Sequence, residues 1–323
     1  MKDPQLLYHA ASTMHRMGKK EDALSILDNH DVGRYYAEDI MDLDFSPRLS
    51  LFLLSERVKI YNDYIDGKRD NASVYYMHLI DTYIKKTISD LQLLSLNDHH
   101  NSVVEANNHK YQILSVKLKQ LYNEGKTFAI VGNGPSLKNK NFGELIDSHD
   151  YIIRVNYYNL KGYEQDVGSK INLWATAASP AYKGLQKDTE PEDIVCILGR
   201  GKSARKNNEL QTTISRAAAG LELDANDFMM MDHITQISTE LYSLYRTPCT
   251  GFRAIIWITQ ILDIKASIFG FDFFQTTNTH YYDKEVKTHQ KHGAEGKWYS
   301  NHDFKWENCL CDILDYQGRL KRY

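Results

Sequence analysis

The sequence predicts an α/β protein in which a Rossmann-like, mostly parallel sheet is flanked by helices and preceded by an α-helical module. Up to about residue 100, apolar residues recur at alternating steps of three and four, which is the helical period. From residue 126 onward, short apolar runs alternate with helical stretches, as is typical of a parallel sheet covered on both faces. We place the boundary near residue 105, so that residues 1–105 form the helical module and residues 106–323 the sheet domain.

The helical module begins with a predicted hairpin over residues 1–30, divided at Gly18. Two amphipathic helices follow, and the apolar faces that define them are Leu51, Leu54, Val58, Tyr61 and Ile65, then Met77, Ile80, Ile84, Ile88 and Leu91. Their expected starts or stops are Pro47, Gly67 and Asn97. An entry helix over residues 110–123 then leads into the sheet domain.

Five strands are predicted in the sheet domain, over residues 127–131, 151–155, 194–198, 228–231 and 266–269. Short apolar runs without polar alternation are expected where a strand is buried on both faces. A last helix is predicted over residues 303–316, with Leu310, Ile313 and Leu314 facing inward and Gly318 near its end.

Composition argues against several classes of protein. The formal net charge of −3 gives no support for binding nucleic acid through its phosphate backbone. Residues 1–31 mix charged and apolar side chains, and no later apolar run is long enough to cross a bilayer. We therefore expect no signal peptide and no membrane span, and a cytoplasmic protein that is free or peripheral at the inner face of the membrane. The four cysteines lack the spacing of a disulfide framework or zinc site, so we expect buried or free thiols.

The first predicted strand runs into a glycine turn, Val131-Gly-Asn-Gly-Pro-Ser-Leu137. Ligands of open parallel sheets bind at the carboxyl ends of strands, where free amides favour phosphate. Gly132 and Gly134 allow close backbone approach, and Pro135 fixes the turn. A dinucleotide site is not expected, because Leu137 replaces the third glycine and the second strand ends in Asn156 instead of an acid. A tight turn without a ligand is the alternative.

Four ordered blocks together resemble the motifs of glycosyltransferase family 29, the animal-type sialyltransferases. The glycine turn with residues 146–156 and 162–168 resembles the large motif, and Pro248-Cys-Thr-Gly251 running to Ile268-Phe-Gly-Phe271 resembles the small motif. His280-Tyr-Tyr-Asp283 resembles the third motif, and His302-Asp-Phe-Lys-Trp-Glu307 resembles the very small motif. The resemblance covers about residues 126–323. The glycine turn is also similar to the opening of the Campylobacter-type bacterial sialyltransferases.

The sequence departs from the family pattern at three positions. Phe128 and Leu262 stand where the family has the two cysteines of its disulfide, and Cys249 replaces the usual Ser before Thr-Gly. Because both disulfide positions have changed together, we expect a reducing compartment and a bacterial origin. We also expect no Golgi-type membrane anchor.

The resemblance implies transfer of sialic acid from CMP-sialic acid to a glycan acceptor with inversion. It implies that Asn133 and Asn156 contact the phosphate and ribose of CMP, and that Thr250 and Gly251 lie near the donor's carboxylate or cytidine. The full predicted substrate-binding set is Gly132, Asn133, Gly134, Ser136, Asn156, Thr250, Gly251, Tyr281 and Tyr282. We expect no cofactor and no obligatory metal, because cytidylate leaves readily once its charge is stabilised.

The same resemblance implies three catalytic residues. His302 is the expected base, and it lies at the start of the last helix, where the positive end of the helix dipole disfavours imidazolium. His280 is expected to donate to the departing phosphate, and Glu307 to orient the site. The alternatives are a capping or surface role for His302, support of the first helical turn for Glu307, packing for Tyr281 and Tyr282, and turn formation for the two asparagines.

Other functions stay open from the sequence. A donor such as CMP-Kdo or another CMP-nonulosonic acid, used in surface polysaccharide synthesis, shares the nucleotide and the carboxylate. The alternative from another class is a non-catalytic protein whose N-terminal helices bind a protein partner. If the protein is an enzyme, the same helices would dock it to a polysaccharide assembly complex. The polar segment 284–297, which contains His289 and His292, is a hypothetical lid over the donor.

Overall fold

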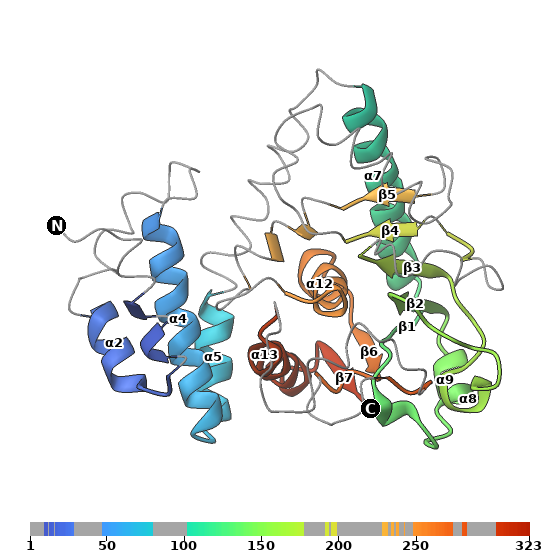
Figure 1. Cartoon of the computed structure of the whole chain (residues 1–323). Coiled ribbons are helices and arrows are strands. Elements are labelled where there is room, and N and C mark those ends of the chain that lie inside the picture. Colours follow the sequence, from blue (N-terminus) through green and yellow to red (C-terminus); the bar gives the residue numbers. More distant parts are fainter. Residues whose placement is uncertain are drawn as a thin grey trace.

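The computed structural model describes residues 10–28, 47–79, 102–177, 191–198, 228–231, 248–273, 280–282 and 302–323, apart from residues 12, 16 and 194, together with residues 234, 235, 237, 238 and 242. The described residues form a seven-stranded sheet flanked by helices (Figure 1). Its strands are β1 (Phe128–Val131), β2 (Tyr151–Val155), β3 (Leu173–Thr176), β4 (Val195–Ile197), β5 (Phe228–Met230), β6 (Ala266–Phe269) and β7 (Leu320–Arg322). All neighbouring strands pair in parallel, which confirms the predicted fold class.

The strand order is β5-β4-β3-β2-β1-β6-β7. From β1 the chain proceeds outward through β2 to β5, then returns to the other side of β1 with β6. Val131, the last residue of β1, is paired with Arg154 of β2 and with Phe269 of β6. The carboxyl ends of β1 and β6 therefore meet at the point where the strand order reverses, which is where open α/β sheets bind ligands.

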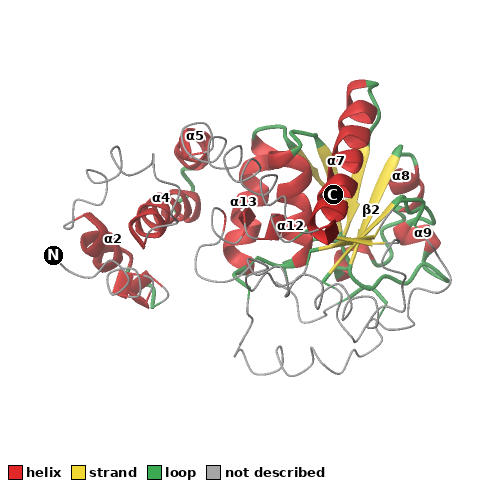
Figure 2. Ribbon diagram, turned by 90° about the horizontal axis from the view of Figure 1, so that it is seen from above, coloured by secondary structure: helices red, strands yellow, loops and turns green. Residues whose placement is uncertain are grey.

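The central strands are buried on both faces. In β1, Phe128 and Ile130 belong to a core cluster shared with helices α7 (Ser102–Asn123), α12 (Thr250–Ile256) and α13 (Phe304–Tyr316). Ala129 and Val131 belong to a second cluster shared with α8 (Gly143–Asp147) and α9 (Glu164–Val167). Figure 2 shows α12 and α13 on one side of the sheet and α8 and α9 on the other. This two-sided burial explains why the strands appear in the sequence as continuous apolar runs.

Of the N-terminal helices, α4 (Pro47–Ile65) and α5 (Arg69–Leu79) pack beside α13, and α2 (Lys20–Asp28) packs on α4 (Figure 1). Gly18, just before α2, and Gly67, between α4 and α5, adopt the left-handed backbone conformation, with φ of +77° and +78°. The rings of Tyr61 in α4 and Trp306 in α13 lie edge to face, 6.3 Å apart. The boundary expected near residue 105 falls within α7 and stays a prediction.

Some elements differ from the sequence-based expectations. The strands β3 and β7 were not expected, and β7 is a three-residue strand at the sheet edge, where its two cations are compatible with an exposed margin. The entry helix begins at Ser102 instead of residue 110. The helix α5, Arg69–Leu79, starts directly after the left-handed turn at Gly67 and contains only Met77 of the second predicted apolar face. Residues 80–101, including Ile84, Leu91 and Asn97, lie outside the described part.

Two expectations from composition can be compared with the structure. All four cysteines are free thiols, and Cys196, Cys309 and Cys311 are buried, as predicted. Phe128 and Leu262, at the positions of the family's disulfide, are buried in the same core cluster. Among the described residues, no helix has both the length and the apolar character needed to cross a bilayer.

Candidate active site

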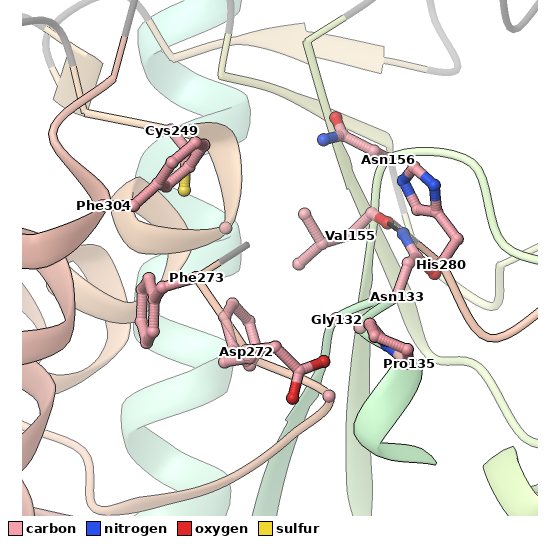
Figure 3. A pocket seen from close by; sticks show the side chains of 14 residues that line it. Gly132, Asn133, Pro135, Val155, Asn156, Cys249, Asp272, Phe273, His280 and Phe304 are labelled. Atoms are coloured by element: carbon pink, nitrogen blue, oxygen red, sulfur yellow. Dashed lines mark hydrogen bonds between the residues drawn. The ribbon is translucent and has the colours of Figure 1, made fainter. Parts of the chain in front are cut away.

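A cavity of about 110 Å³ opens at the switch point, at the carboxyl ends of β1, β2 and β6 (Figure 3). Its walls come from segments far apart in the sequence: the turn 132–135, the end of β2, the start of α12, the turn 270–273, and residues His280 and Phe304. Of the residues predicted to be functional, those that line it are Gly132, Asn133, Gly134, Asn156, Gly251 and His280. The fold thus brings residues of all four motifs to one cavity, the very small motif through Phe304.

The two turns that follow β1 and β6 fit closely together. The N–H of Gly132 donates to the carbonyl of Phe269, and the N–H of Gly134 donates to that of Gly270, both at 2.8 Å. A Cβ atom on Gly132 would lie 2.5 Å from the carbonyl oxygen of Gly270. Such a contact is impossible without movement of the backbone, so glycine is required here by packing.

Asn133 lines the cavity and is bonded to the end of β2. Its Nδ2 donates to the carbonyl of Val155 at 2.7 Å, which fixes the orientation of the side-chain amide, since only the nitrogen can face a carbonyl. The opposite atom, Oδ1, is buried and has no hydrogen-bond partner among the described residues. A buried acceptor without a partner is costly, so the bond from Nδ2 to Val155 is the interaction that fixes this side chain.

Asn156 can present a hydrogen-bond donor, its side-chain amide nitrogen, to the cavity. Its φ of +53° is left-handed, a conformation that Asn adopts more readily than most residues. Its Oδ1 accepts the N–H of Ala177 at 3.1 Å, and its backbone carbonyl accepts Nε1 of Trp174 at 2.6 Å. These bonds hold the residue in place at the end of β2 and leave the amide nitrogen to donate to a ligand.

Only His280 of the described third-motif residues lines the cavity. Its ring stacks on Tyr282, with centroids 5.0 Å apart. Tyr281 and Tyr282 are buried, and the hydroxyl of Tyr281 donates to the carbonyl of Asn159 at 2.7 Å. Burial away from water raises the pKa of the Tyr281 hydroxyl to about 12. The structure therefore places the two tyrosines in the packing that supports His280.

Glu307 lies behind the cavity and holds one of its walls. It is buried in α13, and its Oε1 accepts the N–H of Cys249 at 2.9 Å. Cys249 lines the cavity and caps α12, where its Sγ accepts the N–H of Phe252 at 3.4 Å. Burial raises the pKa of the Glu307 carboxyl group to about 7, and it also raises the pKa of the Cys249 thiol. Thr250, the next residue, is buried and does not line the cavity.

His302 lies next to the cavity wall. It immediately precedes Asp303, the N-cap of α13, whose side chain accepts the N–H of Trp306 at 3.4 Å. The ring of His302 is half-buried and 5.6 Å from the ring of Phe304, which lines the cavity. The expected position at the start of the last helix is therefore confirmed. Residues 283–301, including Asp283 and the proposed lid with His289 and His292, lie outside the described part.

Ser136 is separated from this cavity by Asp272. Its N–H donates to Oδ2 of Asp272 at 3.1 Å, and it lines a neighbouring cavity of about 220 Å³. Asp272 lines both cavities and was not predicted from the sequence. The signal for it is an acid three residues after a predicted strand, in the turn at its carboxyl end. Phe271, Phe273 and Phe304 were also missed as lining residues.

The described residues contain no group of three or more His, Cys, Asp or Glu side chains that could hold a metal ion. In the cavity itself, Asp272 is the one carboxylate and His280 the one imidazole among the described lining residues. The arrangement thus offers hydrogen-bond donors and acceptors of both kinds, together with aromatic rings, to a polar ligand.

Comparisons of the chain with a family model and with curated proteins point to the same family. The chain matches a sequence model of glycosyltransferase family 29 (sialyltransferase) over residues 77–319. It is 26% identical over 235 residues to alpha-N-acetylgalactosaminide alpha-2,6-sialyltransferase 1 of Gallus gallus, covering 60% of this chain and 39% of the relative. It is 24% identical over 208 residues to CMP-N-acetylneuraminate-beta-galactosamide-alpha-2,3-sialyltransferase 2 of Rattus norvegicus, covering 60% and 56%. The chain thus spans less than two thirds of these relatives.

Among solved structures, the chain is similar to a mammalian sialyltransferase in complex with Gal-beta-1-3GalNAc-ortho-nitrophenol. The TM-score is 0.47 and the sequence identity 18%, with coverage of 74% of this chain and 85% of that chain. The two relatives named above are animal proteins. The bacterial origin and the cytoplasmic location expected from the sequence stay predictions.

Proposed function

The chain belongs to glycosyltransferase family 29, the sialyltransferases, and on that premise we propose that it transfers sialic acid from CMP-sialic acid to a hydroxyl group of a glycan acceptor. The observation that carries this proposal is the cavity at the switch point of the sheet. Residues from all four motifs line it, from Gly132 in the large motif to Phe304 in the very small motif. Motifs that converge in this way on the ligand-binding edge of an α/β sheet support a shared substrate site.

The polar groups of the cavity suit a nucleotide donor. Asp272 offers acceptor oxygens, and Asn156 retains an amide nitrogen that can donate. His280 adds a ring nitrogen on the same side of the cavity as Asn156 (Figure 3). A nucleoside monophosphate has both hydroxyl donors and phosphate acceptors, so it can satisfy both kinds of group.

We propose a single displacement with inversion. The acceptor oxygen attacks the anomeric carbon, the bond from that carbon to the phosphate oxygen breaks, and CMP departs with the electron pair. His302 takes the proton of the attacking hydroxyl, while His280 donates a hydrogen bond to the phosphate as its charge develops. Glu307 acts through Cys249, because its carboxyl group holds the backbone that forms the cavity wall. In this scheme the leaving group is stabilised without an obligatory metal.

The test is turnover of CMP-sialic acid by the purified chain with a panel of glycans ending in galactose or N-acetylgalactosamine. We expect His302→Ala to lower kcat by about a hundredfold or more, because general base catalysis contributes that much, while CMP affinity is retained. The matched control is His109→Ala on the exposed face of α7, which should leave both unchanged. Turnover is expected to survive EDTA.

Each part of the proposal has an outcome that contradicts it. Turnover of CMP-Kdo in the same assay, with none of CMP-sialic acid, would replace the donor. A folded His302→Ala protein that transfers as fast as the parent would remove the base. Activity lost in EDTA and restored by a divalent cation would contradict the metal-independent scheme.

A further inference from the structure

Asp272 is held in one position by the turn that follows β1. It lies in the turn 270–273 after β6, and its Oδ2 accepts the N–H of Ser136 at 3.1 Å. A Cβ atom on Gly134 would lie only 1.8 Å from the same oxygen, so the carboxylate rests directly against the glycine turn. Preorganised side chains of this kind are typical of recognition sites, since little conformational entropy is lost on binding.

The position of Asp272 restricts where a phosphate can lie. The Ser136 amide, which would otherwise attract an anion, is already paired with a carboxylate. A phosphate placed there would also meet the negative charge of Asp272. Figure 3 shows Asn156 and His280 on one side of the cavity and Asp272 with Phe273 on the other. The phosphate therefore belongs on the side of His280, and Asp272 is left to a group that is neutral and donates hydrogen bonds.

We propose that Asp272 accepts hydrogen bonds from the ribose hydroxyls of the nucleotide and thereby selects ribonucleotides over deoxyribonucleotides. This inference rests on the proposed function, a CMP-sugar donor in this cavity. An ionised carboxylate has lone pairs to spare after accepting one N–H, and hydrogen bonds to it are stronger than neutral ones.

Two features favour the ribose over the amino group of the base. The ribose is bonded directly to the phosphate, so it lies next to the phosphate in any bound pose. Phe271 and Phe273, whose ring centroids are 6.1 Å apart, line the cavity beside Asp272 and offer aromatic faces to the base. In dinucleotide folds the ribose-binding acid follows the second strand; here that strand ends in Asn156, and the acid follows β6 on the other side of β1.

The experiment measures binding of CMP, 2′-deoxy-CMP and 3′-deoxy-CMP by calorimetry. We expect the parent to bind CMP about ten to a hundredfold more tightly than at least one of the deoxy analogues, as loss of a charge-assisted hydrogen bond predicts. In Asp272→Asn, whose side chain retains an oxygen for the Ser136 N–H, this preference should fall to within about threefold, chiefly because CMP binding weakens. The analogue comparison on the parent needs no variant, so it tests the inference even if Asp272→Asn fails to fold.

The matched control is Asp263→Asn. Asp263 precedes β6 at the opposite end of the strand, and its side chain is 77% exposed, so this variant removes the same charge outside the cavity. It should keep the parent's preference for CMP. Equal affinities for CMP and both deoxy analogues in the parent would overturn the inference, as would an unchanged preference in Asp272→Asn.

Two further results would also overturn it. A change in discrimination between CMP and UMP in Asp272→Asn, with ribose discrimination intact, would assign the residue to the base. CMP binding that requires Mg²⁺ in the parent but not in the variant would assign it to a cation. A folded parent that binds no CMP would overturn the proposed function as well, whereas turnover of CMP-sialic acid without ribose discrimination in binding would overturn this inference alone.

Discussion

The carboxyl group of Glu307 connects α13 to the start of α12 through the N–H of Cys249. Burial raises its pKa from 4.5 to about 7, and the negative charge of Asp303 adds to the effect. At pH values between about 4.5 and about 7, the folded protein keeps a proton on Glu307 that the unfolded chain has released. The contribution of this group to the free energy of unfolding therefore falls as pH rises from about 4.5 through about 7, and is constant above that range.

We expect Glu307→Gln to remove this contribution to the pH dependence of stability. Glutamine keeps an oxygen that can accept the Cys249 N–H but has no proton to lose. The shift in pKa corresponds to at most about 3 kcal/mol between the two limits. Urea unfolding of parent and variant at about pH 5 and about pH 8 measures it, and the parent should lose more stability over this interval. The same loss in both proteins would show that Glu307 does not titrate in this range.

At the scale of secondary-structure elements, the closest fit in the molecule is between the turns after β1 and β6. We expect Gly132→Ala to lower the free energy of unfolding by about 1–3 kcal/mol and to weaken CMP binding, because its Cβ would meet the backbone oxygen of Gly270 at 2.5 Å. The control is Gly125→Ala after α7, where φ is +83° but no atom lies within 4 Å. It should cost about 1 kcal/mol from backbone strain alone and leave CMP affinity unchanged. Equal losses of CMP affinity in both variants would contradict the packing argument.

The strands could be predicted where both of their faces are buried. β2 was predicted with its observed ends, and β1 to within a residue, because every residue in the two strands is buried and all but Arg154 are apolar. β7 could not be found this way, since only Leu320 of its three residues is buried. The strand order was also out of reach, because it depends on pairs such as Ile130 with Ile268, which no local pattern records.

The candidate site could be predicted where a motif is tied to a strand end. Asn133 and Asn156 follow β1 and β2, and the sheet itself brings both to the cavity. Tyr281 was expected at the ligand but is buried, because its hydroxyl bonds to the backbone of Asn159. Whether an aromatic side chain faces the ligand or the core depends on such distant contacts. Asp272 was missed for a related reason. Its position in the cavity is fixed by the N–H of Ser136, which is distant from it in the sequence.

At the scale of the whole molecule, α13 joins the N-terminal helices to the sheet domain. On one side, Tyr64 of α4 donates a hydrogen bond to Asp312, and Gln317 at the end of α13 donates to Oγ of Ser73 at 3.1 Å. On the other, the indole nitrogen of Trp306 donates to the carbonyl of Tyr242 at 2.7 Å. The buried side chains of the two regions form one core cluster. The N-terminal helices therefore support the helix that starts directly after His302 and Asp303.

This shared core predicts that the N-terminal helices and the sheet unfold together. Leu54 in α4 is fully buried within the cluster, so Leu54→Ala should lower the free energy of unfolding by about 2–5 kcal/mol. Because the core is continuous through α13, the variant should shift one transition that involves the whole chain. The matched control is Leu145→Ala in α8, where the leucine is 36% exposed, and it should cost much less.

Calorimetry and tryptophan fluorescence measure this directly, because Trp174 lies in β3 and Trp306 in α13. Coincident transitions by both methods, displaced together by Leu54→Ala, are the expected result for one cooperative unit. Two separate transitions, of which Leu54→Ala moves only the first while CMP binding persists between them, would mean that the helices form an independent module. A cooperative chain instead requires that a destabilised α4 also weakens CMP binding near the transition, since the cavity wall formed by Cys249 depends on Glu307 of α13.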